Sequence, residues 1–406
     1  MEEQRFFENP FIRETPVKMT DGSGQLLPPF KEKLVDNVSK LFSRFENALK
    51  TDSNSNDYSV YTGVAGYAYL YLHLSKVFTK YTVQEHKQTF LSAAQKYVEK
   101  ALQLSKKNKS TFLCGTAGAI SLAAIIYHEQ SMTDKSDEML KRLISIDSKH
   151  ESYDEMLYGR AGILYSLMFA KQSIETQSII NSTHIRSVIE QILKSGQKTA
   201  QKECKGKPPL FYLWHDKAYV GAAHGLIGIL CMLLECKEYL TEEEIDKLVK
   251  PTVDHMFNLR LKSGNYMSSV GSTSDRLIHW CHGATGAVFL FSLAHQIFKD
   301  EKYKNEVINC CELIWKRGIL RKGYGICHGT AGNAYAFIRA YQLTNDDIHL
   351  FRAMKFAEWC FDYGKHGCRV ADRPLSMFEG MAGTIYYLSD LLEPKNSRFP
   401  AFQLSA

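Results

Sequence analysis

The sequence predicts an all-α protein, an α/α toroid (barrel) of seven helical-hairpin repeats arranged as two concentric rings of about seven helices each. Three observations predict it. A Gly-x-x-Gly pair recurs seven times at intervals of 44 to 66 residues. A largely apolar stretch follows most pairs, and amphipathic segments lie between these stretches. The interval fits two helices and two connections per repeat.

The segment 1–56 is more polar than the rest and contains one predicted helix, 31–49, which we expect to complete the outer ring. The repeats run from about 57 to 393, and we expect 1–406 to form a single domain. The glycine pairs are Gly63/Gly66, Gly115/Gly118, Gly159/Gly162, Gly225/Gly228, Gly283/Gly286, Gly329/Gly332 and Gly380/Gly383. Tight turns for close packing are a sufficient role for most of them. We also expect them to leave free backbone N–H groups at one end of the ring.

Apolar stretches after the second glycines, such as 67–72, 119–126, 229–234, 287–293 and 384–388, are apolar on all sides and therefore predict buried helices. Buried strands have similar patterns. The intervening segments decide for helix, because their apolar residues recur every three or four positions. These outer segments are 84–104, 137–146, 184–200, 242–259, 302–315 and 349–361. Two insertions, 203–219 and 263–279, precede the fourth and fifth pairs, where we expect substrate specificity.

Composition limits the class of protein. An apolar fraction of 45% with 23% charged residues is typical of a globular chain. The net charge of +6 is scattered, which argues against nucleic-acid binding. The N-terminus lacks a signal-peptide pattern, Glu2 replaces the glycine of a myristoylation motif, and no apolar run is long enough to span a membrane. We expect a cytoplasmic protein, at most peripherally associated with the plasma membrane, whose ten cysteines are thiols or metal ligands.

Residues capable of chemistry gather just before the first glycine of each pair. The preceding residues are Thr62, Cys114, Tyr158, His224, His282, His328 and Glu379; one step further back are Tyr61, Leu113, Leu157, Ala223, Cys281, Cys327 and Phe378. If the repeats are equivalent, all these residues face the same end of the toroid.

Two repeats carry Cys-His-Gly, and zinc binds thiolate and imidazole well. Cys281 and Cys327 occupy equivalent positions, so they can converge although 46 residues separate them. Cys327 and His328 can share a metal only from a non-helical turn. The residues alone do not distinguish an open site of Cys281, Cys327 and His328 from a closed site that adds His282 or Cys114. Simple burial of the thiols is the structural alternative.

A zinc ion with two thiolate ligands lowers the pKa of an incoming thiol and holds it as a thiolate. Attack on an electrophile then requires a general acid to protonate the carbanion or leaving group. His224 is the first candidate, and a packed core histidine is its alternative role. Arg321, Lys322 and Arg369 are cations that suit peptide carboxylates, although solvation at the surface explains any one of them equally well.

Four motifs carry a resemblance to a known family. Trp280-Cys-His-Gly283, Ala222-Ala-His-Gly225, Glu379-Gly-Met-Ala-Gly383 and the segment 323–332, Gly-Tyr-Gly-Ile-Cys-His-Gly-Thr-Ala-Gly, resemble the lanthionine synthetase C-like proteins of eukaryotes. These are relatives of the bacterial cyclases that join cysteine thiols to dehydroamino acids. The resemblance extends from about residue 6 to 404 and is strongest to the glutathione-binding type.

The resemblance implies one zinc ion per chain, held by Cys281, Cys327 and His328, with glutathione as co-substrate. It also implies that His224 and Lys322 act in catalysis. Bacterial cyclases have an aromatic residue at the position of His282 and an arginine near, but not in register with, Arg276; neither residue receives a role here. The implied glutathione contacts are Lys322, Arg369, Val370, Ala371 and Asp372.

The leading hypothesis is therefore a zinc-dependent glutathione transferase. It would form thioethers with dehydroalanine or dehydrobutyrine in peptides and proteins, or with small aromatic electrophiles. The alternative is a scaffold or signalling adaptor that binds glutathione, zinc and protein partners without turnover. A prenyltransferase-like subunit is disfavoured, because it needs a carboxylate ligand and a helical partner chain. A glycosidase toroid is disfavoured because Glu379 is the only acid among the residues preceding the glycines.

Overall fold

The computed structural model describes residues 4–21, 23–51, 56–82, 86–105, 109–174 and 179–405. Glu2, most of the Ser/Asn-rich stretch after Thr51 and the predicted helix start at 84 lie outside these residues. Within them the chain forms helices, turns and isolated β-bridges, without a β-strand.

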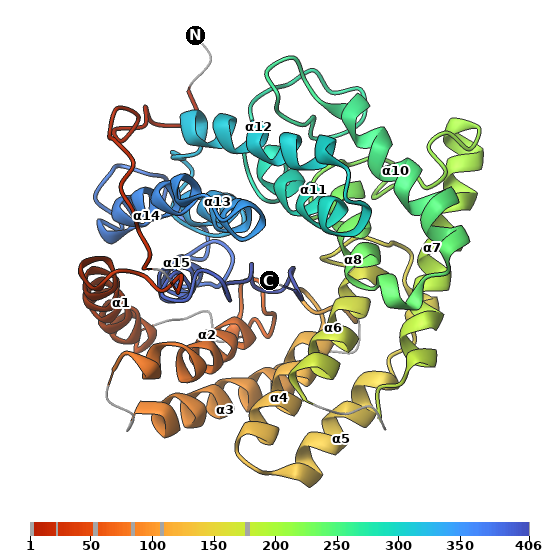
Figure 1. Ribbon diagram of the computed structural model, residues 1–406. Helices are drawn as coiled ribbons and strands as arrows, with labels where there is room; N and C mark the ends of the chain where they lie inside the picture. Colours follow the sequence, from red (N-terminus) through yellow and green to blue (C-terminus); the bar gives the residue numbers. More distant parts are fainter. Residues whose placement is uncertain are drawn as a thin grey trace.

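Seven helices form the inner ring, and each contacts the next around a closed circle in which α15 meets α2 (Figure 1). Most of their residues are buried on every side, as expected for apolar helices. The inner helices are α2 (Val64–Lys76), α4 (Thr116–Glu129), α6 (Arg160–Ser173), α8 (Leu226–Glu235), α11 (Ala284–Phe298), α13 (Thr330–Thr344) and α15 (Met381–Asp390).

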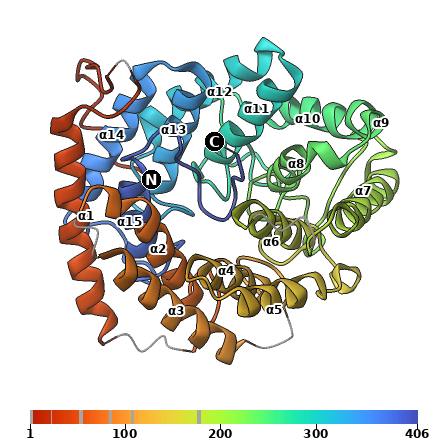
Figure 2. The ribbon, with the colours of Figure 1, turned by 60° about the horizontal axis from the view of Figure 1, so that its bottom comes forward.

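The outer ring surrounds this circle (Figure 2). The predicted toroid of two rings is confirmed, and the N-terminal helix α1 packs on α15 in the outer ring as expected. The outer helices are α1 (Pro28–Leu49), α3 (His86–Leu104), α5 (Thr133–Ile144), α7 (Ser182–Cys204), α9 (Glu242–Glu244) with α10 (Lys250–His255), α12 (Glu301–Arg317) and α14 (Asp347–Phe361).

The outer helices begin a few residues from the predicted starts where polar residues interrupt the apolar pattern. Helix α5 starts at Thr133 instead of 137, and the hydroxyl of Ser136 in its first turn is buried and donates to the carbonyl of Ala124 at 2.9 Å. Helix α7 starts at Ser182, where Asn181 caps it. Between α9 and α10, a π-helical turn, Ile245–Val249, continues the helical segment.

Backbone bonds at the start of the inner helices correct one expectation. The first N–H groups are not free, because each is bonded to the turn before it. The N–H of Val64 donates to Asp57 O at 2.9 Å, and that of Met381 to Pro374 O at 2.8 Å. The same seven-residue spacing recurs at the second, third, fourth and sixth pairs. At the fifth, Ala284 donates instead to Asn265 Oδ1 at 2.9 Å.

The residues two before the first glycines form a chain of backbone hydrogen bonds around one end of the ring. Cys281 N donates to Cys327 O at 3.4 Å, Cys327 N to Phe378 O at 2.8 Å, and Phe378 N to Tyr61 O at 3.0 Å. Tyr61 N continues to Leu113 O at 3.0 Å. The repeats are therefore equivalent in space, as the alignment of their glycines predicts.

The C-terminal tail enters the middle of the ring, where Figure 1 shows the C-terminus. Phe399 stacks on Trp280, with ring centroids 5.1 Å apart. The carboxylate of Glu235 accepts the Ser405 hydroxyl at 2.9 Å. All ten cysteines are free thiols, in agreement with the expectation. In the described part of the chain, no helix has both the length and the apolar character needed to cross a bilayer.

Candidate metal centre

The structure brings Cys281, Cys327 and His328 together from two neighbouring repeats. One ligand atom from each lies within 4.8 Å of the other two, and both thiols are buried. All three residues lie in the non-helical turns that precede α11 and α13, which is the arrangement that adjacent Cys327 and His328 need to face one ion. The chain of backbone hydrogen bonds fixes this meeting, because Cys281 and Cys327 are successive members of it.

The donor set fits zinc. Two sulfurs and one imidazole are preferred zinc ligands, and three protein ligands leave a fourth position for a substrate. Burial and the neighbouring Cys281 sulfur raise the pKa of the Cys327 thiol, so holding this sulfur as a thiolate requires a compensating cation. The Tyr61 hydroxyl donates to Cys327 Sγ at 2.9 Å, a bond that favours the thiolate.

The two residues that would close the site lie apart from this cluster. Neither His282 nor Cys114 belongs to the group of converging ligand atoms among the described residues. Burial, together with the charge of His224, lowers the pKa of His282 to about 4, so this imidazole is neutral at pH 7. Burial raises the pKa of Cys114 to about 12. The arrangement therefore favours the open set of three ligands.

His224 lies near the cluster and is bonded to a carboxylate. Its Nδ1 is 2.9 Å from Glu155 Oε2, and Glu155 also accepts the N–H groups of Leu157 at 2.8 Å and Tyr158 at 2.5 Å. A carboxylate held by backbone donors accepts the proton on Nδ1, which leaves Nε2 for proton transfer. The ring of Tyr219 lies between the imidazoles of His224 and His282. Its centroid is 6.0 Å from that of His224 and 5.7 Å from that of His282.

The insertion at 203–219 reaches this histidine through Trp214. Trp214 stacks on the His224 ring with centroids 3.8 Å apart and planes inclined by 8°. Tyr158 is parallel to both rings at 6.2 Å. This stack fixes the orientation of the imidazole and provides an aromatic surface beside it.

The segments implied to bind glutathione lie side by side. Arg369 N donates to Arg321 O at 2.8 Å, next to Lys322. The Lys322 charge contributes to the lowered pKa of both His279 and His282, so it lies near the metal cluster. The Arg369 guanidinium pairs with Asp372 at 2.8 Å. Val370 is 75% exposed and Ala371 half-buried, so this segment is accessible.

The N-terminal arm supplies a further cation. Arg5 O accepts the N–H of Arg321 at 3.0 Å, and Phe6 forms a β-bridge with Leu320. Arg5 is exposed, and its charge helps to lower the pKa of the buried His279, whose Nδ1 is 3.9 Å from Cys281 Sγ. The charges of Arg5 and Lys322 therefore act on the same buried histidine.

Sequence reasoning missed several of these residues. Tyr61 had a signal, since it occupies the same repeat position as the two cysteines. Glu155, Arg5 and His279 had none, because no repeat position or spacing links them to the metal ligands. Trp214 was indicated only through its insertion.

Comparison with known proteins finds a family model, a curated relative and a solved structure that match the chain. The family described as "Lanthionine synthetase C-like protein" matches residues 54–404. The chain is 42% identical over 414 aligned positions to "Glutathione S-transferase LANCL1" of Danio rerio, with 100% of both chains covered. Among solved structures, "Nisin cyclase" is similar with a TM-score of 0.64 and 16% identity, covering 88% of this chain and 94% of that one. At this identity the nisin cyclase likeness concerns the fold.

Proposed function

Because this chain belongs to the lanthionine synthetase C-like family, we propose that it is a zinc-dependent glutathione transferase that joins the glutathione thiol to electrophiles as a thioether. The observation that carries the proposal is the convergence of Cys281, Cys327 and His328 beside a carboxylate-bonded histidine. The printed name of the Danio rerio relative supports glutathione as the thiol. The preferred electrophile is a dehydroalanine or dehydrobutyrine residue, and a small aromatic electrophile is the second choice.

Cys281, Cys327 and His328 would hold the ion, which when bound lowers the pKa of a coordinated thiol into the neutral range. The protein residues position what reacts. The hydroxyl of Tyr61 withdraws charge from Cys327 and leaves the site better able to accept a third sulfur. Both thiols are buried, whereas His328 and Lys322 are only partly buried, so we expect the glutathione thiol to approach from the side of these two residues.

His224 supplies the proton that completes the addition. The sulfur forms a bond to Cβ of the dehydroamino acid, the C=C electron pair moves to Cα, and Nε2–H of His224 protonates that carbon. That proton comes from the glutathione thiol, which gives it to Nε2 before the attack, so the transfer to carbon returns His224 to the neutral imidazole. Glu155 holds Nδ1 at 2.9 Å and stabilises the imidazolium that precedes each transfer.

Lys322, Arg369 and Asp372 would bind glutathione itself. Glutathione has two carboxylates and one ammonium group, and these match two cations and one acid on adjoining segments. Val370 and Ala371 offer backbone groups between them. Lys322, near His279 and His282, also adds positive charge beside the reacting thiolate.

Metal analysis and a transfer assay test the proposal. We expect the purified protein to contain one zinc ion per chain and to add glutathione to a dehydroalanine peptide. Cys327→Ala should lose the zinc, and its transfer rate should fall at least ~100-fold, because the glutathione thiol is then no longer ionised at pH 7. Cys204→Ala is the control, since Cys204 ends α7 away from the cluster. Retention of zinc and rate in Cys327→Ala contradicts the proposal.

The scaffold alternative predicts a different result for one variant. If the protein only binds glutathione, the peptide reacts equally fast with wild type and with His224→Ala, while glutathione titration shows unchanged affinity in both. An enzyme shows unchanged affinity and a slower rate in the variant.

A further inference from the structure

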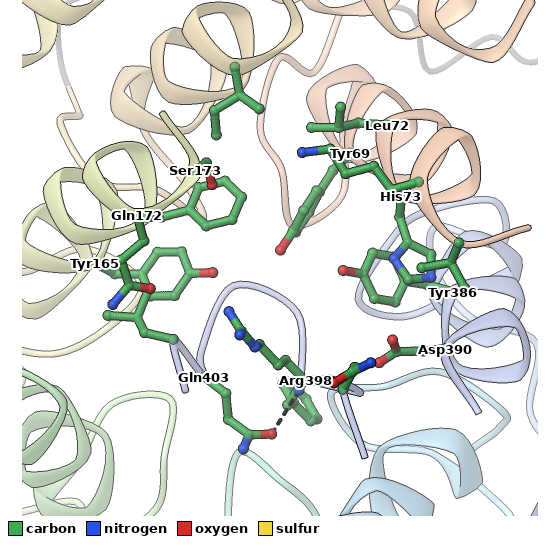
Figure 3. A pocket seen from close by; sticks show the side chains of 17 residues that line it. Tyr69, Leu72, His73, Tyr165, Gln172, Ser173, Tyr386, Asp390, Arg398 and Gln403 are labelled. Atoms are coloured by element: carbon green, nitrogen blue, oxygen red, sulfur yellow. Dashed lines mark hydrogen bonds between the residues drawn. The ribbon is translucent and has the colours of Figure 1, made fainter. Parts of the chain in front are cut away.

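A cavity lies toward the end of the ring opposite the metal cluster. Every inner helix begins at the glycine turns, and this cavity is lined by the later residues of α2, α4, α6 and α15 and by the tail that follows α15 (Figure 3). Its volume is about 260 Å³. That is several times the roughly 30 Å³ share of one water molecule and slightly below the range of drug-sized sites, so it suits a small ligand.

Three tyrosine hydroxyls converge in this cavity. Tyr69, Tyr165 and Tyr386 are at most 7% exposed, and Figure 3 shows their hydroxyl groups pointing toward one another across the space. They come from three different inner helices, α2, α6 and α15. The Tyr69 oxygen accepts the N–H of Ala401 in the tail at 3.4 Å. Burial raises the pKa of all three, so they remain neutral hydrogen-bond donors.

The guanidinium of Arg398 extends from the tail toward these hydroxyl groups (Figure 3). Burial raises the pKa of Tyr165, and the positive charge of Arg398 offsets part of that rise. Among the described residues, no acid lies within ion-pairing distance of this guanidinium and no acceptor takes a hydrogen bond from it. The Arg398 charge also acts on Asp390, where it offsets part of the rise in pKa that burial causes. The cavity therefore combines one cation without an ion pair among the described residues and three neutral hydroxyl groups, of which that of Tyr69 interacts with the other two.

Three other ionisable groups at the cavity are already engaged. The Asp390 carboxylate accepts the Ser397 hydroxyl at 2.7 Å and the N–H of Arg398 at 3.0 Å. Lys76 pairs with Glu129 at 2.7 Å. His73 contacts Ser389 Oγ at 3.1 Å and stacks on Tyr386. The remaining wall includes apolar side chains, among them Phe169 and Phe399, beside the polar Gln172, Ser173 and Asn396.

We propose that this cavity binds a small organic carboxylate. The carboxylate would pair with the two parallel N–H groups of Arg398 and accept hydrogen bonds from the tyrosines, while its hydrocarbon part packs on the phenylalanines. One guanidinium matches a single negative charge, and the apolar part of the wall favours an organic body over a phosphate ion. The site is separate from the metal cluster, so it goes beyond the proposed function and does not depend on it.

Calorimetric titration with sodium benzoate and sodium hexanoate tests the site on the full chain, with benzamide as the neutral isostere. We expect saturable binding of one carboxylate per chain and at least tenfold weaker binding of benzamide. Arg398→Gln should weaken benzoate binding at least tenfold, because a charge-assisted pair is lost. Tyr165→Phe should weaken it severalfold.

Lys395→Gln is the matched control. It removes an exposed cation three residues away on the same tail that does not line the cavity, so benzoate affinity should not change. Arg398 is exposed and its side chain holds no described partner, so its variant should melt like wild type. The proposal is overturned if neither carboxylate binds saturably, if benzamide or Arg398→Gln matches the wild-type benzoate result, or if inorganic phosphate binds more tightly than benzoate.

Discussion

Glu155 shows how one residue gives a neighbouring side chain its role. It is 2% exposed, accepts two backbone N–H groups and receives Nδ1 of His224. Because its lone pairs are committed to these donors, it stays oriented while the imidazole gains and loses a proton. The histidine is thus held for transfer through one nitrogen, and Trp214 prevents the ring from turning.

Replacing this carboxylate should slow the reaction without affecting glutathione binding. In Glu155→Gln the amide keeps the shape but cannot stabilise the imidazolium, so we expect kcat for a dehydroalanine peptide to fall roughly 10- to 100-fold. The KM for glutathione should stay unchanged. Steady-state kinetics over pH 6 to 9 measures both. Glu151→Gln, in the preceding turn, is the control, and an unchanged kcat in Glu155→Gln would remove Glu155 from the mechanism.

At the scale of elements, the second glycine of each pair allows an inner helix to contact the turn before it. A methyl group at Gly118 would overlap the carbonyl oxygen of Phe112 and lie 2.6 Å from Cγ2 of Val60 in the preceding repeat. A methyl group at Gly66 would meet an atom of another repeat, Cβ of Met377 in the seventh repeat. These contacts confirm the packing role predicted for the glycines, and they join the last repeat to the first.

The crowding differs between repeats, which gives a graded test. We expect Gly118→Ala to lower the free energy of unfolding by about 1–3 kcal/mol, because the backbone of the turn must move. Gly286→Ala should cost less, since its nearest neighbour, Trp280 O, would be 2.7 Å from the methyl group. Urea denaturation measures both. Equal effects, or a larger loss for Gly286→Ala, would argue against crowding as the reason for these glycines.

Across the whole molecule, the tail ties the open centre of the ring to its helices. Asp390 on α15 receives Ser397 and Arg398 of the tail and the hydroxyl of Tyr335 on α13, the last at 3.1 Å. Phe399 continues the contact to Trp280, the residue before Cys281. The tail therefore connects the carboxylate cavity to the wall of the metal centre.

Burial raises the pKa of Asp390 from 3.8 to about 7, which makes stability depend on pH. At a pH between 3.8 and about 7, Asp390 is ionised in the unfolded chain and protonated in the folded chain. The free energy of unfolding therefore falls as pH rises through this range, and it levels off above about 7. Asn cannot ionise. From pH 5 to pH 8, wild type should therefore lose roughly 2.5 kcal/mol of unfolding free energy relative to Asp390→Asn. A constant difference across this range, measured by urea denaturation, would contradict the raised pKa.

The sequence by itself determined the two rings, the seven turns and the small set of residues that could share a metal, because these depend on local periodicity and on equivalent positions in a repeat. Only the tertiary structure decided that Cys281 and Cys327 meet without His282 or Cys114, since that depends on which turns are bonded around the ring. It also placed Glu155 against His224 and Arg398 among three tyrosines. Such pairs lie tens to hundreds of residues apart, and no local pattern records contacts that arise only when the ring closes.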